Sequence, residues 1–138
     1  MSETAKAHFV WPVRVYWEDT DGGGVVYYAN YLKFLERART EWLRALGVEQ
    51  RAFAGETGLV FAVSSLAIRY LRPAKLDDML KVTVTITQVG RARLRIAQRI
   101  DADAPCVVAE VEVACVDAAH SRPARIPDFL LERLEQQK

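Results

Sequence analysis

The chain has 138 residues, of which 51% are hydrophobic and 27% are charged, and its formal net charge is +1. A chain of this length forms one domain that buries roughly 68–70% of its unfolded surface, so it can hold a core without disulfides or metals. The composition excludes intrinsic disorder, and the small net charge gives no electrostatic reason to expect a nucleic-acid partner.

The first eight residues, M-S-E-T-A-K-A-H, are polar. They lack the apolar stretch of a signal peptide, and no segment approaches the ~18 uninterrupted apolar residues of a membrane span. We therefore expect a cytoplasmic protein that does not span a membrane. Cys106 and Cys115 would lie about 30 Å apart in an extended strand, too far for a disulfide. A structural zinc site would need more ligands than these two cysteines and the two histidines.

Residues 9–17, F-V-W-P-V-R-V-Y-W, are rich in β-branched and aromatic residues and predict a first strand. Pro12 indicates an edge strand or a strand start, because proline cannot donate a ladder hydrogen bond. An acidic loop with three consecutive glycines follows: Glu18, Asp19, Asp21, Gly22, Gly23 and Gly24. The glycines allow positive φ and let the backbone approach a ligand closely.

A long amphipathic helix is predicted after this loop. Asn30 is a good N-cap candidate, and Gly47 suits the C′ position. Apolar residues recur between them at helical spacing: Tyr31, Phe34, Leu35, Ala38, Trp42, Ala45 and Leu46. The helix is therefore predicted to bury one face. The acidic loop directly before it places a carboxylate near the helix N-terminus.

Four further strands and a short terminal helix are predicted downstream. The strands are residues 59–70, 80–88, 91–100 and 105–116, a short helical or irregular connection spans 48–58, and the terminal helix follows Pro127. This order indicates an α+β fold, with a mainly antiparallel five-stranded sheet packed on one long central helix. A single sheet leaves part of that helix uncovered, so we expect at least a homodimer.

The last two predicted strands form a hairpin around residues 101–104. Their buried faces agree only if paired positions sum to an odd number, which places Arg95 opposite Glu110. The next pair in this register is Arg93 with Glu112. These carboxylates account for both arginines without a ligand.

Residues 14–31, R-V-Y-W-E-D-T-D-G-G-G-V-V-Y-Y-A-N-Y, resemble the signature of hotdog-fold acyl-CoA thioesterases of the 4-hydroxybenzoyl-CoA type. Residues 11–16, 36–41 and 73–80 are similar to the Tol-Pal-associated (YbgC-like) branch of that family. The resemblance implies one hotdog thioesterase domain over residues 1–138, with active sites built at the interface of paired subunits, often in tetramers. It implies hydrolysis of acyl-CoA to free acid and CoA without a metal or cofactor.

The family's catalytic aspartate, followed after two residues by glycine, corresponds to Asp21 followed by Gly24. The implied role of this carboxylate is that of a nucleophile, giving a mixed anhydride, or that of a general base for water. The implied oxyanion donor is the backbone N–H of Tyr28 at the helix start, where the helix dipole suits a developing negative charge. Tyr27 and Asn30 are further substrate-binding candidates, although Asn30 is favoured as a cap.

Many Tol-Pal-associated members carry histidine where this chain has Tyr28, whereas the 4-hydroxybenzoyl-CoA type has tyrosine. Because the implied donor is the main-chain N–H, we expect the oxyanion site to be present without any role for a histidine side chain. The acyl length and the choice between aromatic and aliphatic acyl groups stay open.

The phosphates of coenzyme A suit the forked donors of arginine. Arg91 is the favoured contact, because Arg93 and Arg95 have carboxylates predicted opposite them. Arg69 and Arg72 compete with Arg91 for this role.

Two other functions compete with hydrolysis. A binding module for acyl carrier protein or an envelope-associated complex would keep the fold and make hydrolysis incidental. A hydratase needs a histidine near the helix, whereas His8 and His120 lie elsewhere in the sequence and are predicted to be surface residues. No G-x-S-x-G elbow or P-loop is present. Glu18 and Asp19 are predicted to support the loop rather than to perform chemistry.

Overall fold

The computed structural model describes residues 7–138, so the polar start at residues 1–6 lies outside it. The strands are β1 (Phe9–Arg14), β2 (Leu59–Tyr70), β3 (Met79–Val89), β4 (Arg93–Asp101), β5 (Pro105–Asp117) and the two-residue β6 (Arg122–Pro123). The helices are the 3₁₀ turn η1 (Trp17–Asp19), α2 (Asn30–Ala45), α3 (Gln50–Thr57) and α4 (Asp128–Gln136). No helix among residues 7–138 is long and apolar enough to cross a membrane.

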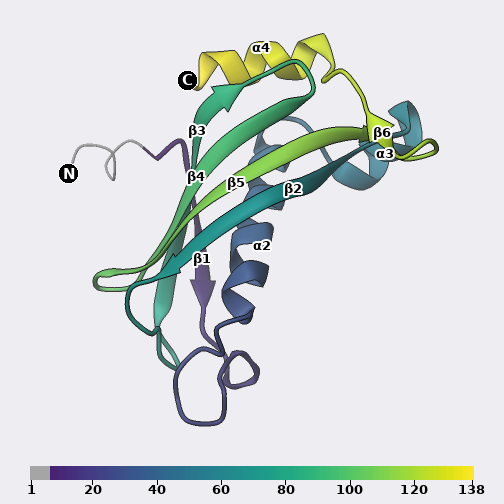
Figure 1. The fold of residues 1–138 in the computed structure, drawn as a ribbon. Coiled ribbons are helices and arrows are strands. Elements are labelled where there is room, and N and C mark those ends of the chain that lie inside the picture. Colours follow the sequence, from purple (N-terminus) through teal and green to yellow (C-terminus); the bar gives the residue numbers. More distant parts are fainter. Residues whose placement is uncertain (1–6) are drawn as a thin grey trace.

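The long strands form one curved antiparallel sheet in the order β1-β3-β4-β5-β2 (Figure 1). This arrangement confirms the predicted α+β class and the five long strands. Pro12 lies on β1, at the predicted sheet edge. The segment after Asp117, expected to be a loop, contains β6, which pairs with the end of β5.

The central helix α2 packs on the side of the sheet where β1 and β3 lie. Its buried residues are Tyr31, Phe34, Leu35, Ala38, Trp42 and Leu43. The predicted apolar face is therefore confirmed, except that Leu43 is buried where Ala45 was expected.

The C-terminal end of α2 has the glycine stop that the sequence predicts. Gly47 has a φ of +93°, its N–H donates to the carbonyl of Arg44 at 3.0 Å, and the N–H of Val48 donates to the carbonyl of Leu43 at 2.8 Å. These are the two hydrogen bonds of a Schellman motif, in which only glycine is free of steric cost at the left-handed position.

The N-terminal end of α2 differs from the prediction, because Asn30 is the first helical residue and Ala29 occupies the N-cap. An N-cap side chain accepts from the backbone when its own residue is extended, but Ala29 is already helical, with φ −69° and ψ −22°. The side chain of Asn30 instead reaches back to the loop and donates to the carbonyl of Asp19 at 2.8 Å.

The predicted β4–β5 register is wrong by two residues. Arg95 lies opposite Glu112 rather than Glu110, and the Glu112 carboxylate contacts both Arg93, at 3.5 Å, and Arg95, at 3.2 Å. Asp101 pairs with Pro105 around a turn at residues 102–104, and a register shift between Ile100 and Asp101 then displaces the remaining pairs. The odd sum of paired positions survives, so the correct faces are still buried.

The two histidines lie far from the start of α2 in the chain and in the fold. His8 is half-buried rather than at the surface, and its Nδ1 accepts the backbone N–H of Ile86 at 3.0 Å. Burial lowers the pKa of His8 below its usual 6.5. His120 is exposed, as predicted, and contacts Asp117 at 2.9 Å.

Candidate active site

The acid-and-glycine loop folds as a short hairpin that leads into α2. Thr20 and Val26 form an antiparallel bridge. The N–H of Tyr27 donates to the carbonyl of Asp19 at 3.0 Å, and the N–H of Asp21 donates to the carbonyl of Val25 at 3.0 Å. The hairpin therefore fixes the backbone on both sides of the glycines.

The hairpin is also tied to the connection between β2 and β3. Val25 forms a bridge with Lys75, and the carbonyl of Gly24 accepts the N–H of Leu76 at 2.9 Å. Gly24 has a φ of +93°, a conformation that favours glycine. The loop is thus anchored to the sheet at the glycine that the sequence singles out.

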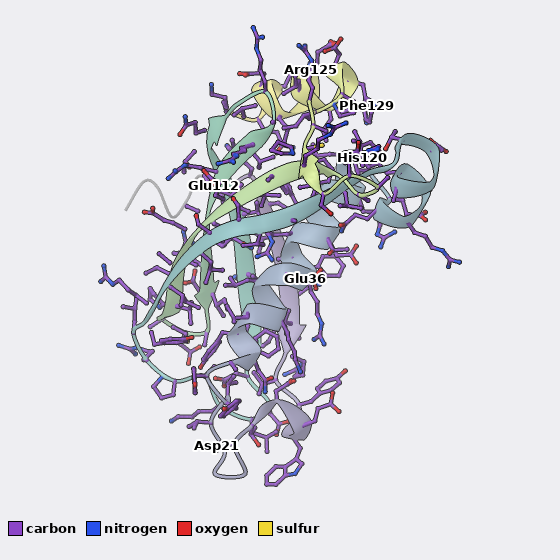
Figure 2. All side chains as sticks on the ribbon, turned by 45° about the vertical axis from the view of Figure 1, so that its right-hand side comes forward. Asp21, Glu36, Glu112, His120, Arg125 and Phe129 are labelled. Carbon is purple, nitrogen blue, oxygen red and sulfur yellow. The ribbon has the colours of Figure 1, made fainter. Side chains whose placement is uncertain are left out.

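Asp21 is exposed on this loop, below α2 (Figure 2). Its Oδ1 accepts the N–H of Gly23 at 2.6 Å. A Cβ at Gly23 would lie 3.1 Å from the same oxygen, a tight contact that would crowd the carboxylate. Within residues 7–138, Oδ2 makes no hydrogen bond, which leaves it available to a reactant.

Tyr28 lies in the turn just before α2, and 61% of its surface is exposed. The carbonyl of Tyr27 accepts the N–H of Asn30 at 2.8 Å. Because the Tyr27–Tyr28 peptide is trans, the N–H of Tyr28 points away from the helix start. It donates to no group in the described part of the chain, so a donor at the positive end of the helix dipole is free.

Asp19 supports the loop from inside, as predicted, and only 8% of its surface is exposed. Its Oδ2 accepts the N–H of Tyr16 at 2.8 Å. Its backbone carbonyl accepts both the N–H of Tyr27 and the side-chain amide of Asn30. Glu18 is exposed beside it.

A tyrosine cluster surrounds the start of α2. Tyr27 and Tyr28 have ring centroids 5.0 Å apart, and Tyr70 lies edge-on to Tyr28 at 6.1 Å and 5.7 Å from Tyr31. Sequence reasoning did not single out Tyr70. The sequence offered one signal for the position of this side chain. Strand alternation places Tyr70 on the same face of β2 as Leu66.

A single chain does not bring Asp21 and Arg91 together. The carbonyl of Arg91 accepts the N–H of Ile126 at 2.7 Å. The neighbouring Arg125 lies at the end of the molecule opposite Asp21 (Figure 2). Arg91 could reach substrate at this site only from another subunit.

The competing arginines lie on two different surfaces. Arg72 lines an open pocket of about 530 Å³ together with Lys75, Asp78 and Asp103, and Lys75 bridges the active-site hairpin. Arg69 lines a pocket of about 500 Å³ on the sheet.

Cys106 and Cys115 are free and buried, and burial raises the pKa of both thiols. Residues 7–138 contain no group of three or more histidine, cysteine, aspartate or glutamate side chains that could hold a metal ion.

Known proteins resemble this chain over most of its length. Residues 15–134 match the thioesterase-like superfamily. The acyl-CoA thioesterase YbgC of Haemophilus influenzae is 48% identical over 120 residues, which cover 86% of this chain and 88% of that protein.

Solved structures extend the comparison to the fold. A probable thioesterase from Bartonella henselae is 36% identical with a TM-score of 0.81, covering 86% of this chain and 98% of that one. A thioesterase from Thermus thermophilus, solved in complex with coenzyme A and Zn, is 25% identical with a TM-score of 0.82 and covers 96% of this chain and 95% of that one. These similarities confirm the predicted hotdog fold.

Proposed function

Because the chain belongs to the thioesterase-like superfamily and is a thioester hydrolase, we propose that it cleaves acyl-CoA to free acid and CoA at the loop ahead of α2. The observation that carries this proposal is the hairpin that presents a carboxylate, Asp21, and a free backbone donor, the N–H of Tyr28. Thioester cleavage needs a nucleophile or a base, and a donor for the oxyanion. The hairpin has both kinds of group.

Asp21 can act in two ways. As a nucleophile, its carboxylate attacks the acyl carbonyl, CoA leaves as the thiolate, and water hydrolyses the mixed anhydride. As a general base, it takes a proton from water, and the water oxygen attacks the carbonyl while CoA departs. In both routes the N–H of Tyr28 stabilises the oxyanion, a contribution typically worth about 10²-fold to 10³-fold in rate.

The neighbouring residues have supporting roles in this proposal. Gly24 lets the backbone approach the acyl group, and Tyr27 offers an exposed ring beside Tyr28. Asn30 acts indirectly, because its side-chain amide is engaged by the carbonyl of Asp19. No cofactor is required by either route.

The phosphates of coenzyme A have two candidate contacts. Arg91 would act from a neighbouring subunit, and Arg72 would act beside the loop of its own chain. Alanine variants separate them, since loss of a phosphate contact raises KM and leaves kcat close to that of the wild type. The T. thermophilus relative in complex with coenzyme A supports this ligand class.

The proposed active unit is a homodimer or homotetramer in the cytoplasm. The edge strand β2 supports self-association, because Val63, Leu66 and Tyr70 are exposed large apolar residues along it. The proposed Arg91 contact requires such a second subunit, because a single chain does not bring Arg91 and Asp21 together. Acyl carrier protein as a partner and a link to the Tol-Pal envelope system remain predictions from the sequence resemblance.

The test is release of free thiol from a panel of acyl-CoA and acyl-carrier-protein thioesters. Asp21→Asn should lower kcat by about 10²-fold to 10⁴-fold, the range of a lost general base. Glu56→Gln, which makes the same carboxylate-to-amide change at an exposed position on α3, should match the wild type. Equal turnover by the wild type and Asp21→Asn would refute the proposed site. Single turnover in ¹⁸O-labelled water tests the nucleophile route, since only water attack on the Asp21 carbonyl of the mixed anhydride puts label into Asp21. Label in the acid product alone is compatible with both routes, because water can also attack the acyl carbonyl of the anhydride.

A further inference from the structure

Tyr70, at the end of β2, contacts the start of α2 with both its ring and its hydroxyl. Its ring is nearly perpendicular to that of Tyr28, at 89° and 6.1 Å between centroids. Its hydroxyl lies 3.5 Å from the backbone carbonyl oxygen of Tyr28. One side chain therefore touches both the side chain and the main chain of the residue that carries the proposed oxyanion donor.

The residues around Tyr70 are held in place by backbone hydrogen bonds and by packing. The next residue, Leu71, donates its N–H to the carbonyl of Cys106 on β5 at 2.8 Å. On the other side, Tyr70 packs on Tyr31 at 5.7 Å. Tyr31 is 3% exposed, and its hydroxyl accepts the N–H of Ala74 at 2.9 Å. The Tyr70 ring is thus held by the hydrogen-bonded end of β2 and by its packing on the buried ring of Tyr31.

The Tyr28 turn has less support of its own. In a regular helix the N–H of Leu32 would donate to the carbonyl of Tyr28, but it donates to Ala29 at 3.2 Å. The carbonyl of Tyr28 is therefore outside the helical ladder and has the Tyr70 hydroxyl as its contact. At 3.5 Å this hydrogen bond is long, so the ring packing carries most of the interaction.

We propose that Tyr70 is a positioning residue that holds the Tyr28 turn in the orientation its N–H needs to receive the oxyanion. This inference rests on the proposed hydrolysis. An oxyanion donor works only when it is already aimed at the developing charge, and a misplacement of about 1 Å can cost on the order of 10²-fold in rate. The Tyr70 ring supplies that aim from the sheet.

The experiment compares Tyr70→Ala, Tyr70→Phe and Phe129→Ala in steady-state hydrolysis of the best acyl-CoA substrate. Tyr70→Ala should lower kcat about 10-fold to 10²-fold with little change in KM, because donor geometry matters in the transition state. Tyr70→Phe keeps the ring and should retain most of the wild-type kcat. Phe129 is 42% exposed, against 46% for Tyr70, and lies at the end of the molecule opposite Asp21 (Figure 2), so Phe129→Ala should behave as the wild type.

Two results would overturn the positioning role. One is a Tyr70→Ala variant whose KM rises while kcat is unchanged, which is the behaviour of a substrate-binding wall. The other is a Tyr70→Phe variant as impaired as Tyr70→Ala. Thermal unfolding and sedimentation check that each variant keeps the wild-type fold and mass. If Tyr70→Ala fails this check, Tyr70→Leu takes its place in the assay.

The same assay separates this inference from the proposed function. A wild-type enzyme without turnover on any thioester would refute the hydrolase and the positioning role together. An active wild type, an inactive Asp21→Asn and a fully active Tyr70→Ala would refute only the role of Tyr70.

Discussion

Two aspartates two residues apart have opposite environments in the candidate active-site hairpin. Asp21 is exposed and has one carboxylate oxygen engaged by the loop, whereas Asp19 is buried and bonded to the backbone of Tyr16. A buried, hydrogen-bonded carboxylate stabilises its surroundings, and an exposed one can meet a substrate. Residue type alone does not separate these roles, but the geometry does.

Asp19→Ala should therefore act first on stability. The variant loses the hydrogen bond from the Tyr16 N–H, at a cost of about 1 kcal/mol of unfolding free energy for a hydrogen bond of this kind. Urea unfolding measures the loss, with Glu18→Ala as the exposed control. If the two variants unfold at the same urea concentration, the supporting role of Asp19 is wrong.

His8 gives the fold a dependence on pH. Burial lowers its pKa below 6.5 in the folded protein, and its neutral Nδ1 accepts the N–H of Ile86. Folding thus favours the neutral form, whose stabilisation is complete above pH 6.5 and is lost as the pH falls toward the lowered pKa. Asp117, with its pKa lowered by the hydrogen bond to His120, is protonated only below its usual 3.8.

Urea unfolding between ~pH 5.5 and ~pH 8 therefore reports His8 without Asp117. The stability of the wild type relative to His8→Gln should decline as the pH falls through this interval, because glutamine can accept the Ile86 N–H without titrating. Parallel pH profiles of the two proteins would contradict this account.

At the scale of helices and strands, the sequence correctly predicted the features that depend on local patterns. The apolar spacing of α2 and its glycine stop are short-range signals, and β2 at Leu59–Tyr70 was predicted residue for residue. The β4–β5 register was missed, because the register shift beside the turn leaves the alternation of apolar residues unchanged.

The candidate site shows the same difference between local and long-range features. The loop, Asp21 and Tyr28 were predicted from a contiguous motif. Tyr70 was missed because it comes from another element, 42 residues from Tyr28 in sequence. Asn30 was misassigned as a cap because Ala29 is already helical, which the sequence does not show.

The C-terminal end of α2 supports a matched pair of glycine substitutions. Gly47 is left-handed, and the guanidinium of Arg133, which donates to the Leu46 carbonyl, occupies the space of an added Cβ. Gly47→Ala should lower the free energy of unfolding by about 1–2 kcal/mol, the cost of a left-handed alanine.

Gly55, inside α3, has open space around it. Gly55→Ala should raise the free energy of unfolding by about 0.5–1 kcal/mol. Thermal or urea unfolding of both variants gives the comparison. A Gly47→Ala protein as stable as Gly55→Ala would show that the Schellman motif does not constrain the fold.

For the whole molecule, the two sheet edges are unequal. β1 has six residues and contains Pro12, which disfavours pairing of its free edge with a further strand. β2 has 12 residues, contains no proline, and exposes Val63 and Leu66. A long apolar edge of this kind pairs with another strand or aggregates. Pairing between two copies of β2 would satisfy the edge and extend the sheet across a two-fold axis.

If the protein forms the proposed β2-paired dimer, Leu66→Lys should convert it to monomers, because a charge at that interface must be desolvated without a partner. Hydrolysis should fall in parallel if the second subunit completes the active site. Val10→Lys introduces the same charge on the exposed surface of β1 and should leave both mass and activity unchanged. Sedimentation velocity and thiol release on the same samples test the link. A Leu66→Lys protein of wild-type mass would place the interface elsewhere, and an active monomer would show that each chain holds a complete site.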